Sequence, residues 1–264
     1  MSAARLREAD RALAERLADA AGRAVLPYFR RLDHLDLKAD SSPVTAADRA
    51  AEQAMRQILA AERPGDGILG EEFEPVAGTG ERLWVLDPID GTKAFVTGKP
   101  MFTTLIALVE RRIPVLGVID QPWTRERWFG DGTRATLNGQ PIQTRGCTAL
   151  EAAVLSSTAP GMFQSEAERA ALARLQGATA AMSWGGDAYA YGLLAAGCID
   201  LVLETNLQPF DLAALVPVVT GAGGVITDWQ GRPLTLDSAG DVLAAGDAAL
   251  HRQALRTLGG CGTS

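Results

Sequence analysis

The spacing of apolar residues changes twice along this chain of 264 residues, and the changes limit the folds open to it. Residues 1–63 place apolar side chains at helical spacing. They predict two amphipathic helices, one ending near Pro27 and one running from about Thr45 to the residue before Pro64. The polar stretch between them contains a proline and is predicted to be a connector.

From Gly67 onward the pattern becomes that of strands, with short apolar or alternating runs bounded by turn residues. The expected strands are GILGEE, RLWVLD, FTTLIALV, PVLGVID and RERWFG, followed by a hairpin at Asn138-Gly139. Helices followed by a strand meander predict an α+β half over residues 1–145.

Residues 146–264 alternate strand and helix patterns, which predicts a second, α/β half. Its last long helix is expected to begin near Asp211 and carries Pro217, which predicts either a kink or an early end. The fold class expected from pattern alone is therefore mixed α/β (α+β), with strands in both halves.

Charge and composition exclude several classes of function. A net charge of −7 and a pI near 5.0 disfavour nucleic-acid binding, which needs a clustered basic surface. No apolar run is long enough to span a membrane, and the charged N-terminus lacks the apolar core of a signal peptide, so a cytoplasmic protein is expected. The three cysteines show no paired spacing, which disfavours a zinc site or a disulfide framework.

Residues 84–95, WVLDPIDGTKAF, carry the strongest chemical signal. Asp87 ends an apolar strand, and we expect the turn at Pro88-Ile89 to bring Asp90 back beside it. Gly91-Thr92 then opens a short helix, whose free N–H groups suit a phosphate. Because carboxylates repel phosphate, hard cations are needed between them, and Mg²⁺ accepts both kinds of oxygen ligand.

Two further acidic residues strengthen this interpretation. Glu71 follows another predicted strand, and Asp211 stands after a proline and an aromatic residue at a predicted helix start. Taken singly, Glu71 is better explained as a solvated loop charge and Asp211 as a helix N-cap. The pattern around residues 87–92 is equally a capped turn.

Taken together, these motifs resemble the inositol monophosphatase superfamily of Mg²⁺-dependent phosphomonoesterases. The resemblance rests on GEE, WVLDPIDGT with its following phenylalanine, and FD leading into a helix with AGG, in that order between about Lys38 and Gly246. It implies a layered αβαβα sandwich of the inositol monophosphatase and fructose-1,6-bisphosphatase type, and a homodimer.

The resemblance also implies roles for individual residues. The expected metal ligands are Glu71, Asp87, the carbonyl of Ile89, Asp90 and Asp211. They would hold two or three Mg²⁺ ions, with Mn²⁺ as a substitute. Asp48 and Thr92 would orient the attacking water, and Glu71 would also belong to the catalytic centre. Asp90, Gly91 and Thr92 would contribute to the binding of the phosphate, and Lys38 would lie in a connected loop. The chemistry is hydrolysis by an activated water, without a covalent nucleophile.

Within the superfamily the chain resembles the histidinol-phosphate phosphatase branch most, through GVIDQP and WGGDAYAYGL. L-Histidinol phosphate carries an ammonium group and an imidazole, so its pocket should offer a carboxylate and a wall for the ring. Gly185, Asp187 and Glu204 are the expected substrate-binding residues of residues 146–264, together with Asp211. Asp187 is equally a candidate N-cap, and Trp184 is either a pocket wall or a core residue.

Other functions stay open at this stage. In a second hypothesis the protein is an enzyme of the same kind whose substrate is an inositol phosphate or a nucleotide 3′-phosphate. A third is a metal-binding regulatory protein that keeps the fold without turnover, although the presence of Asp48 and Thr92 favours an enzyme.

Overall fold

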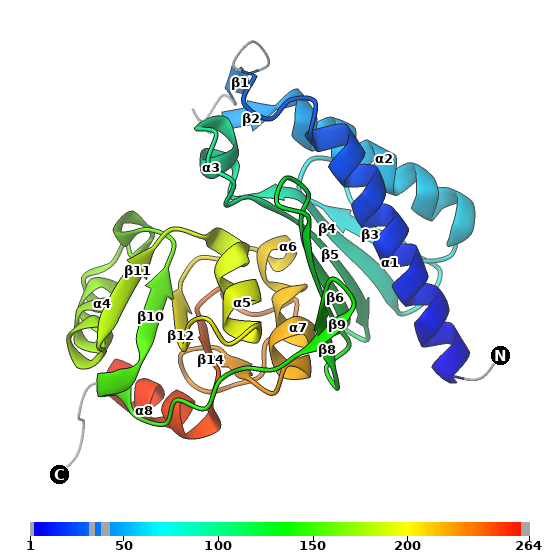
Figure 1. Ribbon diagram of the computed structural model, residues 1–264. Coiled ribbons are helices and arrows are strands. Elements are labelled where there is room, and N and C mark those ends of the chain that lie inside the picture. Colours follow the sequence, from blue (N-terminus) through cyan, green and yellow to red (C-terminus); the bar gives the residue numbers. More distant parts are fainter. Residues whose placement is uncertain (1–2, 32–34, 38–42, 260–264) are drawn as a thin grey trace.

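The computed structural model describes residues 3–31, 35–37 and 43–259. Its elements stack in five layers, alternating helices and sheets (Figure 1). This is the layered αβαβα sandwich expected from the resemblance. Within the described residues, no helix has both the length and the apolar character needed to cross a membrane.

The first layer consists of α1 (Ala3–Val25) and α2 (Ala46–Glu62), as the helical spacing predicted. A short antiparallel pair, β1 (Leu35–Leu37) and β2 (Pro43–Thr45), precedes α2. The apolar stripes of the two helices are buried on one face of a sheet, with Leu17 and Met55 packing in the same core as Trp84 of that sheet. Burial of these stripes drives the docking.

The second layer is a seven-stranded sheet in the order β3-β4-β5-β6-β7-β8-β9. Its strands are β3 (Gly67–Gly70), β4 (Arg82–Asp90), β5 (Thr103–Glu110), β6 (Ile113–Gln121), β7 (Glu126–Gly130), β8 (Ala135–Leu137) and β9 (Gln140–Ile142). From β4 onward it is the predicted antiparallel meander, with Asn138 and Gly139 both at positive φ in the last hairpin. Only β3 runs parallel to its neighbour β4, so Glu71 follows β3 at the sheet edge where Asp87 lies.

Strand β4 differs from the prediction, because it continues through residues 88–90 instead of ending at Asp87. Asp87 pairs with Leu105 of β5 and Asp90 with Thr103, so three steps on β4 oppose two on β5. This one-residue excess is a β-bulge. In a regular strand two residues three apart point to opposite faces, and the bulge restores Asp87 and Asp90 to the same face.

The third, middle layer contains α5 (Asp187–Ala195), α6 (Pro209–Leu212) and α7 (Leu215–Gly221), packed between the two sheets (Figure 1). The single helix expected after Asp211 is two helices that break at Ala213-Ala214. Pro217 lies in the first turn of α7, where its missing N–H is not needed. Of the two predicted outcomes, a kink is the correct one, because Ala213 and Ala214 keep helical backbone angles and α7 continues through Pro217 to Gly221.

The fourth layer is a five-stranded sheet in the order β11-β10-β12-β14-β13. Its strands are β10 (Val154–Ser157), β11 (Ala181–Trp184), β12 (Leu201–Glu204), β13 (Val225–Thr227) and β14 (Val242–Ala245). Helices α4 (Glu166–Ala178) and α8 (Ala248–Leu258) form the fifth layer, over the outer face. Strands β10, β11 and β12 are parallel, so their carboxyl ends share one edge.

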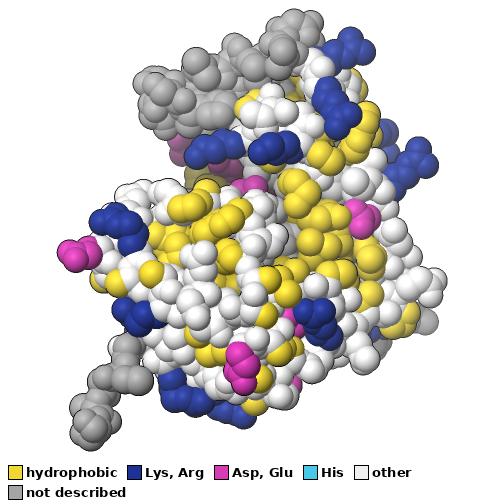
Figure 2. Space-filling model, turned by 60° about the vertical axis from the view of Figure 1, so that its left-hand side comes forward, with side chains coloured by type: hydrophobic (Ala, Val, Ile, Leu, Met, Phe, Trp, Pro, Cys, Tyr) yellow, Lys and Arg dark blue, Asp and Glu magenta, His cyan; other side chains and the backbone are white. Residues whose placement is uncertain are grey.

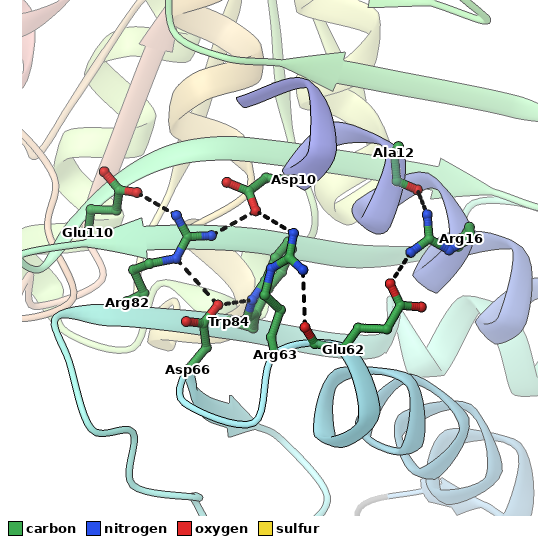
Figure 3. Close-up of polar contacts among 9 residues, drawn as sticks. All are labelled: Asp10, Ala12, Arg16, Glu62, Arg63, Asp66, Arg82, Trp84 and Glu110. Atoms are coloured by element: carbon green, nitrogen blue, oxygen red, sulfur yellow. Dashed lines mark hydrogen bonds and ion pairs between the residues drawn. The ribbon is translucent and has the colours of Figure 1, made fainter. Parts of the chain in front are cut away.

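An ion-pair network ties the first helix to the first sheet (Figure 3). Asp10 of α1, only 3% exposed, accepts hydrogen bonds from Arg63 at 3.2 Å and from Arg82 of β4 at 2.8 Å. Arg82 also pairs with Asp66 at 3.3 Å and with Glu110 at 3.0 Å. Each buried carboxylate here has a guanidinium partner, which is what burial of charge requires.

Candidate active site

Three carboxylates meet where β4 approaches α6. Ligand oxygens of Asp87, Asp90 and Asp211 all lie within 4.8 Å of one another. Asp87 is 2% exposed, and the other two are half-buried. Strand β4 thus supplies two of the carboxylates through its bulge, and the first turn of α6 supplies the third.

Backbone N–H groups hold each carboxylate in place. Asp87 Oδ1 accepts from the N–H of Ile89 at 3.0 Å, and Asp90 Oδ2 accepts from the N–H of Ala188 at 2.7 Å. Asp211 Oδ2 accepts from the N–H of Gln208 at 2.7 Å, which makes Gln208 the N-cap of α6. The alternative of Asp211 as the N-cap residue is wrong, although its side chain does stabilise the cap as the third residue of a capping box.

The electrostatics of this cluster are unfavourable without a cation. Burial and the nearby carboxylates, Glu71 foremost, raise the pKa of Asp87 well above its usual range. Burial and Asp187 do the same for Asp90, and burial raises the pKa of Asp211 to about 6. No Lys or Arg among the described residues forms an ion pair with any of the three. An all-oxygen, acidic and desolvated donor set fits a hard divalent cation.

A cavity of about 550 Å³ opens beside the cluster, and most of the expected site residues line it. These are Asp48, Glu71, Gly91, Thr92, Gly185 and Asp187. Figure 2 shows partly hidden acidic side chains in this region, with basic side chains beside them nearer the surface. Lys38 lies outside the described residues.

Asp48 and Thr92 come to the cavity from two helix starts. Asp48, 2% exposed, lies in the first turn of α2, and Thr92 is the first residue of α3 (Thr92–Val96). The Thr92 hydroxyl donates to the carbonyl of Ile89 at 3.1 Å. The predicted roles of these residues in catalysis stay predictions, but the fold does bring them to one cavity.

Gly91 lets the two halves of the site approach closely. Its φ of +78° favours glycine, and a Cβ placed there would lie 3.0 Å from Asp187 Oδ2 and 3.3 Å from the carbonyl oxygen of Met101. A side chain at position 91 would therefore press on the Asp187 carboxylate and on the Met101 carbonyl. Gly91 leaves room for both groups beside the end of β4.

Residues 185–187 form a loop at the end of β11 with three successive positive φ angles, 91°, 122° and 45°. Helix α5 begins at Asp187 with Gly186 as its N-cap, and no side chain caps it. The N-cap interpretation of Asp187 is therefore wrong. Burial raises the pKa of Asp187 to about 6, against a lowering by Lys93. Its carboxylate faces the cavity instead of satisfying a helix end.

Glu204 lies behind the cavity wall. It ends β12, is 2% exposed, and accepts hydrogen bonds from the Thr158 hydroxyl at 2.5 Å and the Tyr191 hydroxyl at 3.1 Å. Burial raises its pKa to about 7, with the Thr158 hydrogen bond opposing the rise. Glu204 thus reaches the cavity through Thr158, which does line it.

Sequence reasoning did not identify Thr158, Tyr191, Lys93 or Lys99, of which all but Tyr191 line the cavity. A signal for Thr158 existed, because it follows the polar end of a parallel strand, an edge where sites form. Trp184 is not a core residue: its side chain is 42% exposed and lines the cavity. The pocket-wall alternative is the correct one.

Comparison with known proteins decides the family. A sequence model described as "Inositol monophosphatase family" matches residues 7–262. The chain belongs to the inositol monophosphatase family. It is accordingly a phosphatase of a metal-dependent family that acts on small phosphate esters, and its structure contains an acidic cluster that could hold a metal ion.

Named relatives cover almost the whole chain. A protein named "Bifunctional phosphatase IMPL2, chloroplastic" from Arabidopsis thaliana is 46% identical over 94% of this chain and 74% of its own length. The "Histidinol-phosphatase" of Mycobacterium tuberculosis is 37% identical over 94% of this chain and 97% of its own. A solved inositol monophosphatase from Zymomonas mobilis is 50% identical, with a TM-score of 0.89, covering 98% of this chain and all of the other.

Proposed function

We propose that this phosphatase hydrolyses L-histidinol phosphate to L-histidinol and phosphate, with Mg²⁺ as its metal. The observation that carries the proposal is the carboxylate of Asp187, which lines the cavity beside the metal cluster. An acidic group there, beyond those that would hold metal, suits a substrate whose alcohol part is cationic. The relative named histidinol-phosphatase, 37% identical over nearly the whole length of both chains, supports the same substrate.

Glu71, Asp87, Asp90, Asp211 and the carbonyl of Ile89 would hold the metal ions. Bound there, divalent cations activate water and neutralise the charge that develops on the phosphoryl group. The protein's contribution is to hold the carboxylates in place before substrate arrives. Hydrogen bonds from the backbone N–H groups of Ile89, Ala188 and Gln208 do this.

The residues around the phosphate would act by orientation. Asp48 would accept a proton from the attacking water, and the Thr92 hydroxyl, which donates to the Ile89 carbonyl, would align that water. Backbone N–H groups of Gly91 and Thr92 would receive the phosphate oxygens. Asp187 and Glu204, the latter through Thr158, would bind the ammonium end of the substrate.

A second candidate substrate is an inositol phosphate. The solved Zymomonas mobilis protein, described as an inositol monophosphatase, is 50% identical to this chain. The metal chemistry would be the same, and the difference lies in the residues that contact the alcohol.

The test is phosphate release from L-histidinol phosphate and from inositol 1-phosphate, side by side, with Mg²⁺ and with EDTA. We expect Mg²⁺-dependent hydrolysis and a preference for histidinol phosphate of about a hundredfold in kcat/KM, or ~2.7 kcal/mol. Equal rates, or a preference for the inositol ester, would reject the substrate while keeping the metal chemistry. Release that persists in EDTA would reject the metal.

We also propose that the protein works in the cytoplasm as a homodimer. The dimer rests on the family resemblance, and sedimentation equilibrium of the purified protein would test it.

A further inference from the structure

Trp184 lies at an unusual place for a large aromatic side chain. It is the last residue of β11, the edge strand of the five-stranded sheet, and its side chain is 42% exposed. It is the only aromatic residue among those described that line the cavity. Most buried aromatics in this chain pack against other rings, yet among the described residues no ring or cation stacks on Trp184.

The backbone around Trp184 is held in place although its ring is not packed. Trp184 pairs with Ser157 in the parallel ladder between β10 and β11. The next N–H, that of Gly185, donates to the carbonyls of Ser157 at 3.0 Å and Thr158 at 3.1 Å. An indole on such a rigid support lines the cavity, and holding it there for a ligand costs little further entropy.

The cavity that Trp184 lines is open beside Gly185 and is lined mainly by acidic side chains among its charged groups. A Cβ placed on Gly185 would meet no heavy atom within 4 Å, so nothing in the described chain fills the volume beside it. Four carboxylates, those of Asp48, Glu71, Glu72 and Asp187, line the cavity against the two ammonium groups of Lys93 and Lys99. An aromatic face next to acidic groups suits a flat ring that carries positive charge.

We infer that Trp184 is a specificity-determining residue, whose indole face stacks on the imidazole ring of the substrate while Asp187 binds its ammonium group. The inference rests on the proposed function and extends it. It assigns recognition of the ring to one side chain and predicts that esters of cationic heteroaromatic alcohols are preferred over aliphatic ones.

The test compares the wild-type enzyme with Trp184→Leu, which keeps apolar bulk but removes the ring, and with Trp184→Phe, which restores a smaller ring. Each is assayed with L-histidinol phosphate, with O-phosphoethanolamine, which has the ammonium group but no ring, and with inositol 1-phosphate. For histidinol phosphate, W184L should raise KM by about tenfold and leave kcat nearly unchanged. W184F should bring KM most of the way back to the wild-type value. For the two esters without a ring, KM should change by less than about threefold, because no stacking is lost.

The outcomes separate this inference from the proposed function. If the wild-type enzyme prefers histidinol phosphate and W184L keeps that preference, the stacking role is wrong and the substrate stands. If the wild-type enzyme shows no such preference, both fail. Equal KM losses on all three esters, or a change in sedimentation of W184L, would make Trp184 a general wall or a subunit contact and would overturn the inference.

Discussion

Two groups of buried acidic residues in this molecule differ in what surrounds them. Around Asp10, each carboxylate is paired with a guanidinium, and Arg82 alone contacts Asp10, Asp66 and Glu110 (Figure 3). These partners raise the pKa of Arg82, although burial acts to lower it. Around Asp87, carboxylates face carboxylates, and their pKa values are raised. The first arrangement holds charge that is already balanced, whereas the second is unbalanced until a cation binds.

The comparison shows how burial alone fails to distinguish structure from function. Asp10 at 3% exposed and Asp87 at 2% exposed are equally hidden from solvent. What separates them is the sign of the neighbouring charge, because an unpaired buried charge is costly and is retained only where a ligand uses it. Three variants or conditions test this distinction.

Replacing Asp90 with Asn should have the largest effect. The amide oxygen can still accept the N–H of Ala188, but one negative charge is lost from the metal cluster. We expect phosphate release to fall by about a thousandfold or more, ~4 kcal/mol in transition-state free energy. The metal-free variant should be at least as stable as the wild-type protein, because a repulsion is relieved.

Phosphate release and urea unfolding in EDTA measure the two effects for D90N. Activity within tenfold of wild type would show that Asp90 does not hold the metal. A strong loss of stability would place Asp90 with the balanced group around Asp10 and would break the comparison.

Replacing Asp10 with Asn should do the opposite, lowering stability with little effect on catalysis. The side chain is buried, and its removal leaves Arg63 and Arg82 without that partner. Because both guanidinium groups are still 28% exposed, we expect a loss of roughly 2–3 kcal/mol, below the range for fully buried pairs. Urea unfolding of D10N measures it.

The matched control for D10N is Glu81→Gln. Glu81 pairs with Arg111, and the side chain of Glu81 is 67% exposed and that of Arg111 80% exposed. An ion pair this exposed contributes little to the free energy of unfolding, so E81Q should unfold at the same urea concentration as the wild-type protein. If D10N is no less stable than E81Q, the network in Figure 3 is not a stabilising one.

The pH dependence of the metal-free protein should show the smallest effect. The folded pKa of Glu204, about 7, lies above the value of an unfolded glutamate, so its contribution to stability is full at low pH and is lost as the pH rises through 7. Between pH 6 and 8 the free energy of unfolding should fall on the order of 1 kcal/mol more in the wild-type protein than in Glu204→Gln.

Urea unfolding in EDTA at the two pH values gives this difference. The pKa of buried His251 is lowered by its burial, which changes stability in the opposite direction over part of this range. That contribution is common to both proteins and cancels in the comparison. Parallel pH profiles for the wild-type protein and E204Q would show that Glu204 titrates normally in the folded state.

The sequence alone was sufficient where the signal is local. Helical spacing predicted α1 and α2, Asn138-Gly139 predicted the last hairpin of the first sheet, and the ordered acidic motifs predicted the family. These features depend on nearby residues, or on motifs whose order along the chain can be compared directly.

Tertiary structure decided what depends on distant contacts. Pro88-Ile89 predicted that Asp90 returns beside Asp87, but the structure achieves this by a β-bulge within a continuous strand, which depends on the pairing of β4 with β5. Asp187 lines the cavity and does not cap α5, and its carboxylate lies close to Gly91, 96 positions earlier in the chain. The exposure of Trp184 likewise follows from its place at a sheet edge. Short-range preferences therefore determined the elements and the kind of chemistry, whereas which groups share one space was determined by how the two sheets pack.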